Sequence, residues 1–181
     1  MVIGIHKNTD GKNVNGGTFI GEIIKEINND LNSKNKKSND NYIIGEIYIE
    51  EKDVNKEIRI INSYEEVVRF FFWEEFKEEL KNEEQIKECE IEINNELIPF
   101  NYFYKFKKEG KYIIKYKFKN FLTNTNHMFY ECKSLIYLNL SNFKTQNVKH
   151  MVHMFYYCKS LQKVITADKR ILRQLKLDEI I

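Results

Sequence analysis

Apolar positions change their spacing along the chain, and each change marks an expected element. Between Phe19 and Ile27 they recur at helical spacing, which predicts a short amphipathic helix over about residues 18–31, followed by a polar linker to residue 41. From Tyr42 the period becomes two. Isoleucine-rich alternation of this kind is typical of strands, expected here at residues 42–50, 57–62, 89–93, 97–106 and 111–119.

The helical period returns once between these strands. Ser63 has the residue type of an N-cap, and Glu66 three residues later completes a capping-box pattern. An apolar face running from Val67 to Leu80 predicts one helix over about residues 63–81. A half-open sheet crossed by this helix is the expected packing.

The most specific pattern is an internal repeat with a period of 26 residues. HMFYECKSL at His127–Leu135 returns as HMFYYCKSL at His153–Leu161, with eight of nine positions identical. The spacing i, i+3, i+4, i+7 in each unit predicts a short helix, and Leu-x-x-Leu-x-Leu after it predicts a strand. Stacked units of this kind bury a shared core. The expected core residues are Met128, Phe129, Cys132, Leu135, Leu138, Leu140, Phe143, Val148, Met151, Met154, Phe155, Cys158, Leu161 and Val164.

MFYECKSLIYLNLSNFKTQNVKHM, residues 128–151, resembles the 26-residue leucine-rich-type repeat of BspA-like and mycoplasma-type surface proteins, roughly MF-x-x-C-x-SL-x-x-L-x-LSNF-x-T-x-NV-x-x-M. The resemblance covers residues 121–166. IRIINSYEE at 58–66 is similar, less closely, to the segment that precedes such repeats in some protozoal proteins. The resemblance implies a leucine-rich solenoid with a role in adhesion or protein recognition, and it implies no catalytic residues.

Two units are fewer than the three or so that repeats usually need for stability, so neighbouring segments are expected to cover both ends. Ile113, Tyr116 and Phe118 suit the front, and a capping helix over about 168–178 suits the back. The predicted fold is α+β, a β-rich domain with one crossing helix that continues into a two-repeat solenoid. Its expected parts are an N-terminal segment (1–41), the β-rich domain (42–120), the repeats (121–166) and a C-terminal cap (167–181).

Charge is unevenly distributed, although the net charge of the 181 residues is only +2. Residues 74–98 carry ten glutamates against three lysines, whereas residues 99–120 carry seven lysines and one glutamate. The simplest interpretation is that the acidic and basic segments attract each other within the fold; the alternative is that the basic half meets an acidic partner. The abundance of Lys, Ile and Asn indicates an AT-rich coding sequence.

Candidate chemistry is sparse. The three cysteines (Cys89, Cys132 and Cys158) form no disulfide pattern and are expected to be reduced and buried. His127, His150 and His153 lie near two of them, but the zinc-clamp spacings are missing, so neither a metal nor another cofactor is expected. Motifs of phosphate-binding loops, nucleophile elbows and zinc proteases are also missing, and we expect no catalytic residue and no enzyme.

The outward positions of the repeat strands and of the strand before them form the candidate binding face. These residues are Lys115, Lys117, Ile136, Tyr137, Asn139, Gln162, Lys163 and Ile165. A mixed Tyr, Lys and Asn surface favours recognition of a protein partner, with tyrosine as the anchor. An ordinary solvated sheet is the alternative interpretation of the same pattern.

The leading hypothesis is therefore a non-catalytic, monomeric protein-interaction module. Binding of nucleic acid or another acidic polymer by the lysine- and aromatic-rich stretch 105–119 is the alternative, and a shortened paralogue without a partner stays possible. The sequence carries neither a signal-peptide pattern nor an apolar run long enough to span a bilayer, so no membrane insertion and a cytoplasmic location are expected.

Overall fold

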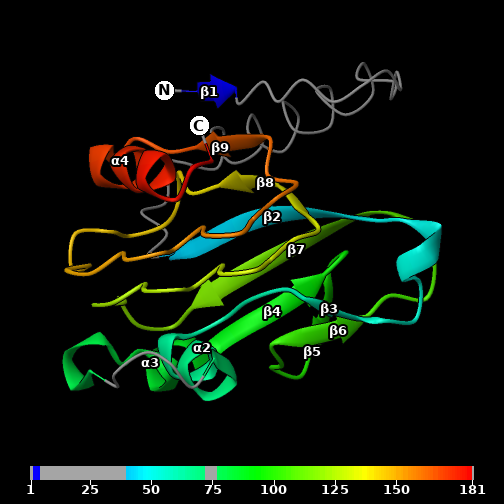
Figure 1. The fold of residues 1–181 in the computed structure, drawn as a ribbon, viewed down its shortest axis with the longest axis horizontal. Coiled ribbons are helices and arrows are strands. Elements are labelled where there is room, and N and C mark those ends of the chain that lie inside the picture. The colour runs from blue at the N-terminus through cyan, green and yellow to red at the C-terminus, as the bar shows by residue number, and fades with distance from the viewer. Residues whose placement is uncertain (1, 5–39, 72–76, 181) are drawn as a thin grey trace. The chain divides into compact units, whose positions relative to one another are not determined.

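The computed structural model describes residues 2–4, 40–71 and 77–180. Nearly all of them belong to one compact unit with a single buried cluster. Figure 1 shows the strands and helices of this unit. The predicted helix at 18–31 and most of the predicted linker lie outside the described residues. The domain boundaries drawn from the sequence stay a prediction.

A seven-stranded sheet forms the framework, in the order β1-β9-β8-β2-β7-β4-β5. Its strands are β1 (Val2–Gly4), β2 (Tyr42–Ile49), β4 (Cys89–Ile93), β5 (Glu96–Ile98), β7 (Gly110–Phe118), β8 (Leu135–Asn139) and β9 (Lys163–Ile165). All neighbours are antiparallel except β8 and β9, which run parallel. A separate antiparallel pair joins β3 (Glu57–Arg59) to β6 (Phe103–Lys105).

Period-two alternation explains why these segments are strands. In β4 buried and half-buried residues alternate without a break, and β4 has the bounds predicted from the sequence. In β2 the inner face carries Gly45, over which Leu135, Leu138 and Tyr116 pack so closely that a β-carbon there would meet side-chain atoms at 3.2–3.5 Å. The missing side chain lets the first repeat strand pack tightly against β2.

The predicted strand over residues 97–106 is wrong as a single element. The chain forms β5, then leaves the large sheet, and forms β6 in the second sheet. Pro99 follows β5 directly. Because proline lacks the N–H that a sheet ladder requires, it ends the strand at this point.

Three short α-helices occur among the described residues, α2 (Tyr64–Phe71), α3 (Glu83–Lys87) and α4 (Lys169–Leu177), together with the 3-10 turns η1 (Glu51–Asp53) and η2 (Glu78–Leu80). Ser63 caps α2 as predicted, since its Oγ accepts the Glu66 N–H at 3.2 Å. The predicted continuation of this helix to residue 81 is wrong, because Lys77 is extended and η2 follows it. The predicted C-terminal helix is confirmed as α4.

The predicted leucine-rich solenoid is a further error. The architecture is a mixed α+β fold with a sheet core, and the repeat strands β8 and β9 are two members of the larger, mainly antiparallel sheet. The strand expected to lead the array, β7, does not neighbour β8. Instead β2 pairs with β7 on one side and β8 on the other. Two units are too few to bury their own edge, so the array merges into a sheet built by distant strands.

The helices predicted within the repeats are absent as well, since both segments are runs of turns. His127 and Glu131 have φ values of 58° and 59°, and their equivalents His153 and Tyr157 have 52° and 60°. A right-handed helix cannot continue through such residues. Turns can nevertheless place the same residues inward, and all fourteen predicted core residues are buried, at 9% exposure or less.

Candidate functional site

The two repeat units lie side by side through a ladder of backbone hydrogen bonds. N–H groups of the first unit, at Thr125, His127, Phe129 and Glu131, donate to carbonyls of the second unit at 2.9–3.0 Å. The four accepting carbonyls belong to His150, Val152, Met154 and Tyr156. Each pair is separated by 25 residues, so the ladder follows the sequence period and gives the paired turns a fixed shape.

Two asparagines complete this ladder at the front. No repeat unit precedes the first one, so its carbonyl groups need hydrogen-bond donors from elsewhere in the chain. Asn82 Nδ2 donates to the carbonyls of Asn126 at 2.8 Å and Asn124 at 3.4 Å. Asn62 donates its backbone N–H to Met128 and its side-chain amide to Tyr130, at 2.8 and 3.0 Å. The two asparagines thus take the place of a neighbouring unit.

Asp178 caps the other end of the ladder, beyond the second unit. In the first unit the Phe129 N–H donates to a carbonyl of the next unit, whereas in the second unit the Phe155 N–H donates to Asp178 Oδ2 at 2.9 Å. The Asp178 carboxylate is buried, and it also accepts from Gln174 Nε2 at 2.9 Å. The C-terminal residues therefore supply the acceptor that a third unit would have provided.

The structure brings together only part of the predicted binding face. Tyr137 lies beside Lys163 and Asn139 beside Ile165 across the parallel pair β8–β9. Gln162 is exposed just before β9, and Ile136 occupies the register shift between Leu135 and Tyr137. Lys115 and Lys117 are farther away than predicted, because β2 lies between their strand and β8.

The anchor predicted for this face is not accessible. Tyr137 is only 3% exposed. Lys115 stands over the Tyr42 ring at 4.5 Å, and Lys117 forms an ion pair with Glu92. The parts of the face on β8 and β9 that a partner could reach are exposed Gln162 and half-exposed Ile136, Asn139, Lys163 and Ile165.

The lysine-rich stretch 105–119 pairs with the glutamates of the preceding sequence. Its ion pairs are Lys105 with Glu57 at 3.4 Å, Lys111 with Glu46 at 3.8 Å, Lys117 with Glu92, and Lys119 with Glu90 at 3.4 Å. This agrees with attraction between the acidic and basic segments. It also reduces the free positive charge that a phosphate backbone would need.

A group of rings that sequence reasoning missed lies on the turns of the repeats. We call His153, Tyr156, Tyr157 and Lys159 the tyrosine surface, which lies over the buried ring of Tyr130. The rings of Tyr130 and Tyr156 stack with their centres 5.7 Å apart. The rings of Tyr156 and Tyr157 pack edge to face, with their centres 4.6 Å apart. Tyr157 is 43% exposed, and the Lys159 Nζ atom lies 5.3 Å from the centre of its ring. The neighbouring Tyr157 hydroxyl raises the pKa of Tyr156.

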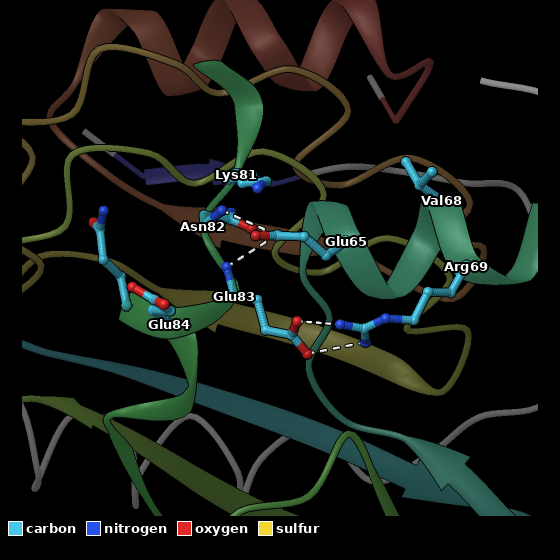
Figure 2. A pocket seen from close by; sticks show the side chains of 8 residues that line it. Glu65, Val68, Arg69, Lys81, Asn82, Glu83 and Glu84 are labelled. Carbon is cyan, nitrogen blue, oxygen red and sulfur yellow. Dashed lines mark hydrogen bonds and ion pairs between the residues drawn. The ribbon is translucent and has the colours of Figure 1, made fainter. Parts of the chain in front are cut away.

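A polar pocket of about 530 Å³ lies between α2 and α3 (Figure 2). Glu65 reaches from α2 to accept the backbone N–H groups of Asn82 and Glu83, both at 3.0 Å. Arg69, one turn later, makes a two-pronged contact with the Glu83 carboxylate. Arg69 and Glu83 form an ion pair in this pocket, and Glu65 is held by backbone N–H groups, which marks the pocket as a structural junction between the two helices.

The pH dependence of stability should reveal this junction. Hydrogen bonding from Arg69 lowers the pKa of Glu83 to about 2, against an ordinary value near 4.5. Since the folded state favours the ionised form, the contribution is present above about pH 4.5 and is lost as the pH falls toward 2. Urea unfolding should show Glu83→Gln about 1–3 kcal/mol less stable than wild type at neutral pH.

That difference should shrink steadily as the pH is lowered from 5 to about 2.5. The same change at the exposed neighbour Glu84 is the control. A Glu83→Gln deficit that stays constant over this pH range would contradict the assignment.

Buried thiols and imidazoles complete the inventory of reactive groups. The three cysteines are free and buried, as predicted. Burial raises the pKa of Cys132 to about 12 and also raises the pKa of Cys89, so neither is a thiolate at neutral pH. Burial lowers the pKa of His127 to about 3. Across residues 2–4, 40–71 and 77–180, no group of three or more His, Cys, Asp or Glu side chains could hold a metal ion.

These features define a sheet-based α+β protein with two stacked repeat units capped by Asn62, Asn82 and Asp178. Residues 74–170, more than half of the chain, match the family described as "Mycoplasma protein of unknown function, DUF285", and the chain belongs to that family. The match agrees with the mycoplasma-type part of the resemblance noted for residues 121–166. It leaves the BspA-like and leucine-rich assignments as resemblance alone.

No curated protein matches the chain, and no solved structure does. Within the described part of the chain, no helix combines the length and the apolar character required to cross a membrane.

Proposed function

We propose that this protein is a non-catalytic module that recognises another protein. The observation that carries the proposal is the tyrosine surface. Tyrosine rings offer a large contact area and a polar hydroxyl at low cost in side-chain entropy, and they are enriched among the residues that dominate binding energy. Here Tyr156 and Tyr157 are held by ring contacts and by the backbone ladder, so little order has to be gained on binding.

The absence of suitable reactive groups among the described residues supports a non-catalytic role. The two thiols with a raised pKa are protonated, His127 is neutral, and in the charged pocket between α2 and α3 Arg69 and Glu83 pair with each other. Nucleic-acid binding by residues 105–119 is the weaker alternative, because four of the seven lysines there pair with glutamates.

A capture experiment with the full chain tests the proposal. Three baits are compared in lysate of the source cells at physiological and high salt: wild type, Tyr156→Ala/Tyr157→Ala, and Asn139→Ala/Lys163→Ala. The captured protein is then purified, and its dissociation constant is measured for each bait. We expect binding that survives high salt and weakens at least about tenfold with the tyrosine variant.

The Asn139→Ala/Lys163→Ala variant decides between the tyrosine surface and the sheet face predicted from the sequence. A selective loss with that variant would move the interface to β8 and β9. Capture of nucleic acid at low salt only, equal for all baits, would overturn the proposal in favour of the basic stretch.

A further inference from the structure

Arg59, at the end of β3, is a buried guanidinium held between aromatic rings. Its side chain is 10% exposed. The guanidinium carbon stands 4.2 Å from the centre of the Phe103 ring and 5.7 Å from that of Phe70. Because Phe103 lies on β6 and Phe70 on α2, two separate elements fix the position of this side chain.

The positive charge of Arg59 is incompletely compensated. Its Nη1 atom is fully buried, and none of the described residues accepts a hydrogen bond from it. The nearest carboxylate oxygen, Glu66 Oε1, is 3.9 Å away, too far for a hydrogen bond, and Glu66 also pairs with Arg69 at 3.3 Å. Buried arginine donors normally have partners, so an unpaired one indicates a missing acceptor.

A second pocket, of about 330 Å³, is lined by Arg59. Its walls come from β3, α2, β6 and the turn that precedes β8. The lining residues are Glu57, Ile58, Arg59, Phe70, Phe103, Glu131, Lys133 and Ser134. Phe70 is 60% exposed, so its ring forms an accessible apolar wall beside the guanidinium. The pocket has the size of one or two amino-acid side chains and combines an apolar wall with the guanidinium of Arg59, whose Nη1 has no hydrogen-bond partner among the described residues.

The charges around the pocket distinguish between anions. Glu57 pairs with Lys105, and Glu131 pairs with Lys133 at 3.2 Å. With Glu66 also near, three carboxylates would repel a doubly charged phosphate group about twice as strongly as a singly charged carboxylate, whose charge the Arg59 guanidinium matches one to one. The planar fork of arginine suits a carboxylate in particular.

Two features point to a peptide as the carrier of the carboxylate. The pocket lies beside β3, whose only strand neighbour among the described residues is β6, so no described strand pairs with its other edge. The pocket also adjoins the tyrosine surface, because the Glu131 N–H donates to the Tyr156 carbonyl at 2.9 Å. A protein partner on the tyrosines would have a segment within reach.

We propose that the Arg59 pocket binds the carboxylate of a partner peptide, with an adjacent apolar residue against Phe70 and Phe103. The inference rests on the proposed function, since it takes a partner protein as the source of the carboxylate. A glutamate or aspartate side chain and a free C-terminus both provide this group, and the test separates them.

The test is an array of immobilised hexapeptides probed with the labelled full chain. Each amidated peptide has a central Glu between varied apolar and polar neighbours, and each has a Gln twin. A third set carries the Gln sequence with a free C-terminal carboxylate. Wild type should retain carboxylate peptides at least about tenfold better than their amidated Gln twins, whichever of the two carboxylate sets is preferred.

Arg59→Gln should abolish this preference, Arg59→Lys should weaken it, and Lys119→Gln, whose ion pair with Glu90 lies outside the pocket, should preserve it. Because Arg59→Gln removes a charge that lacks a hydrogen-bond partner, the variant is expected to fold, and its melting curve is compared with wild type. Equal retention of the twins, no retention of any peptide, or a preference that survives in Arg59→Gln would overturn the inference. The lysate experiment uses tyrosine variants and intact proteins, so the two proposals can fail separately.

Discussion

Replacing Asn82 with alanine is expected to lower the free energy of unfolding by about 3–5 kcal/mol. The side chain is buried, and its Oδ1 accepts the Tyr64 N–H at 2.9 Å while its Nδ2 serves the carbonyls of Asn124 and Asn126. Alanine would leave these three backbone groups without partners, and each unpaired buried group costs about 1–3 kcal/mol. Urea denaturation followed by circular dichroism measures the loss.

Asn147→Ala is the matched control for this prediction. Asn147 is exposed on a turn of the same repeat, and its substitution should change the stability by no more than about 0.5 kcal/mol. Asn82→Asp adds a second test, because it keeps the acceptor for Tyr64 but turns a carboxylate toward two carbonyl oxygens. Equal stability of the Asn82→Ala and Asn147→Ala proteins would show that the front of the ladder does not depend on this side chain.

The role of Asn82 could not have been predicted from composition. Asparagine occurs 21 times in the chain, and this abundance is typical of AT-rich coding sequence. Nothing local distinguishes Asn62 and Asn82, which cap carbonyls more than 40 residues away, from exposed asparagines such as Asn147. The repeat did allow one prediction. Because only two units are present, hydrogen-bond donors from outside the repeats must pair with the carbonyls of the first unit.

Strand positions were predictable because burial on one side of a sheet requires period two, as β2 and β4 show. Strand order was not, since the insertion of β2 between β7 and β8 joins segments about 70 and 90 residues apart, and no local pattern records that pairing. The repeat turns were predicted as helices because the spacing i, i+3, i+4, i+7 also fits the inward residues of consecutive turns. Glu131 and Tyr157 are not residue types that favour positive φ, so the spacing alone predicts an ordinary helix there.

The tyrosine surface and the Arg59 pocket were hidden for the same reason. Tyr130, Tyr156 and Tyr157 come together only because the two turns stack in register. Arg59 meets Phe103 only because β3 pairs with β6. Both sites depend on long-range pairing, whereas the face chosen from the sequence depended on the alternation of one strand.

A pair of substitutions on β8 tests the faces of the sheet. Leu138→Ala should lower the free energy of unfolding by about 2–5 kcal/mol, because Leu138 is fully buried on the inner face and packs over Gly45. The alternation of the strand alone predicts that Tyr137→Ala costs little, since Tyr137 occupies the outward position. Its burial reverses that expectation, and truncating a buried aromatic ring should cost about 3–5 kcal/mol.

Ile136→Ala separates the two interpretations, since Ile136 lies between these residues on the same strand and is only half-buried. It should cost clearly less than either neighbour in the same urea denaturation series. If Tyr137→Ala behaved like Ile136→Ala, the outer side of β8 would be accessible, and the sheet face centred on Asn139 and Lys163 would regain its place as the candidate interface. If Tyr137→Ala instead destabilises as strongly as Leu138→Ala, both sides of this strand are committed to the fold, and recognition has to come from the turns.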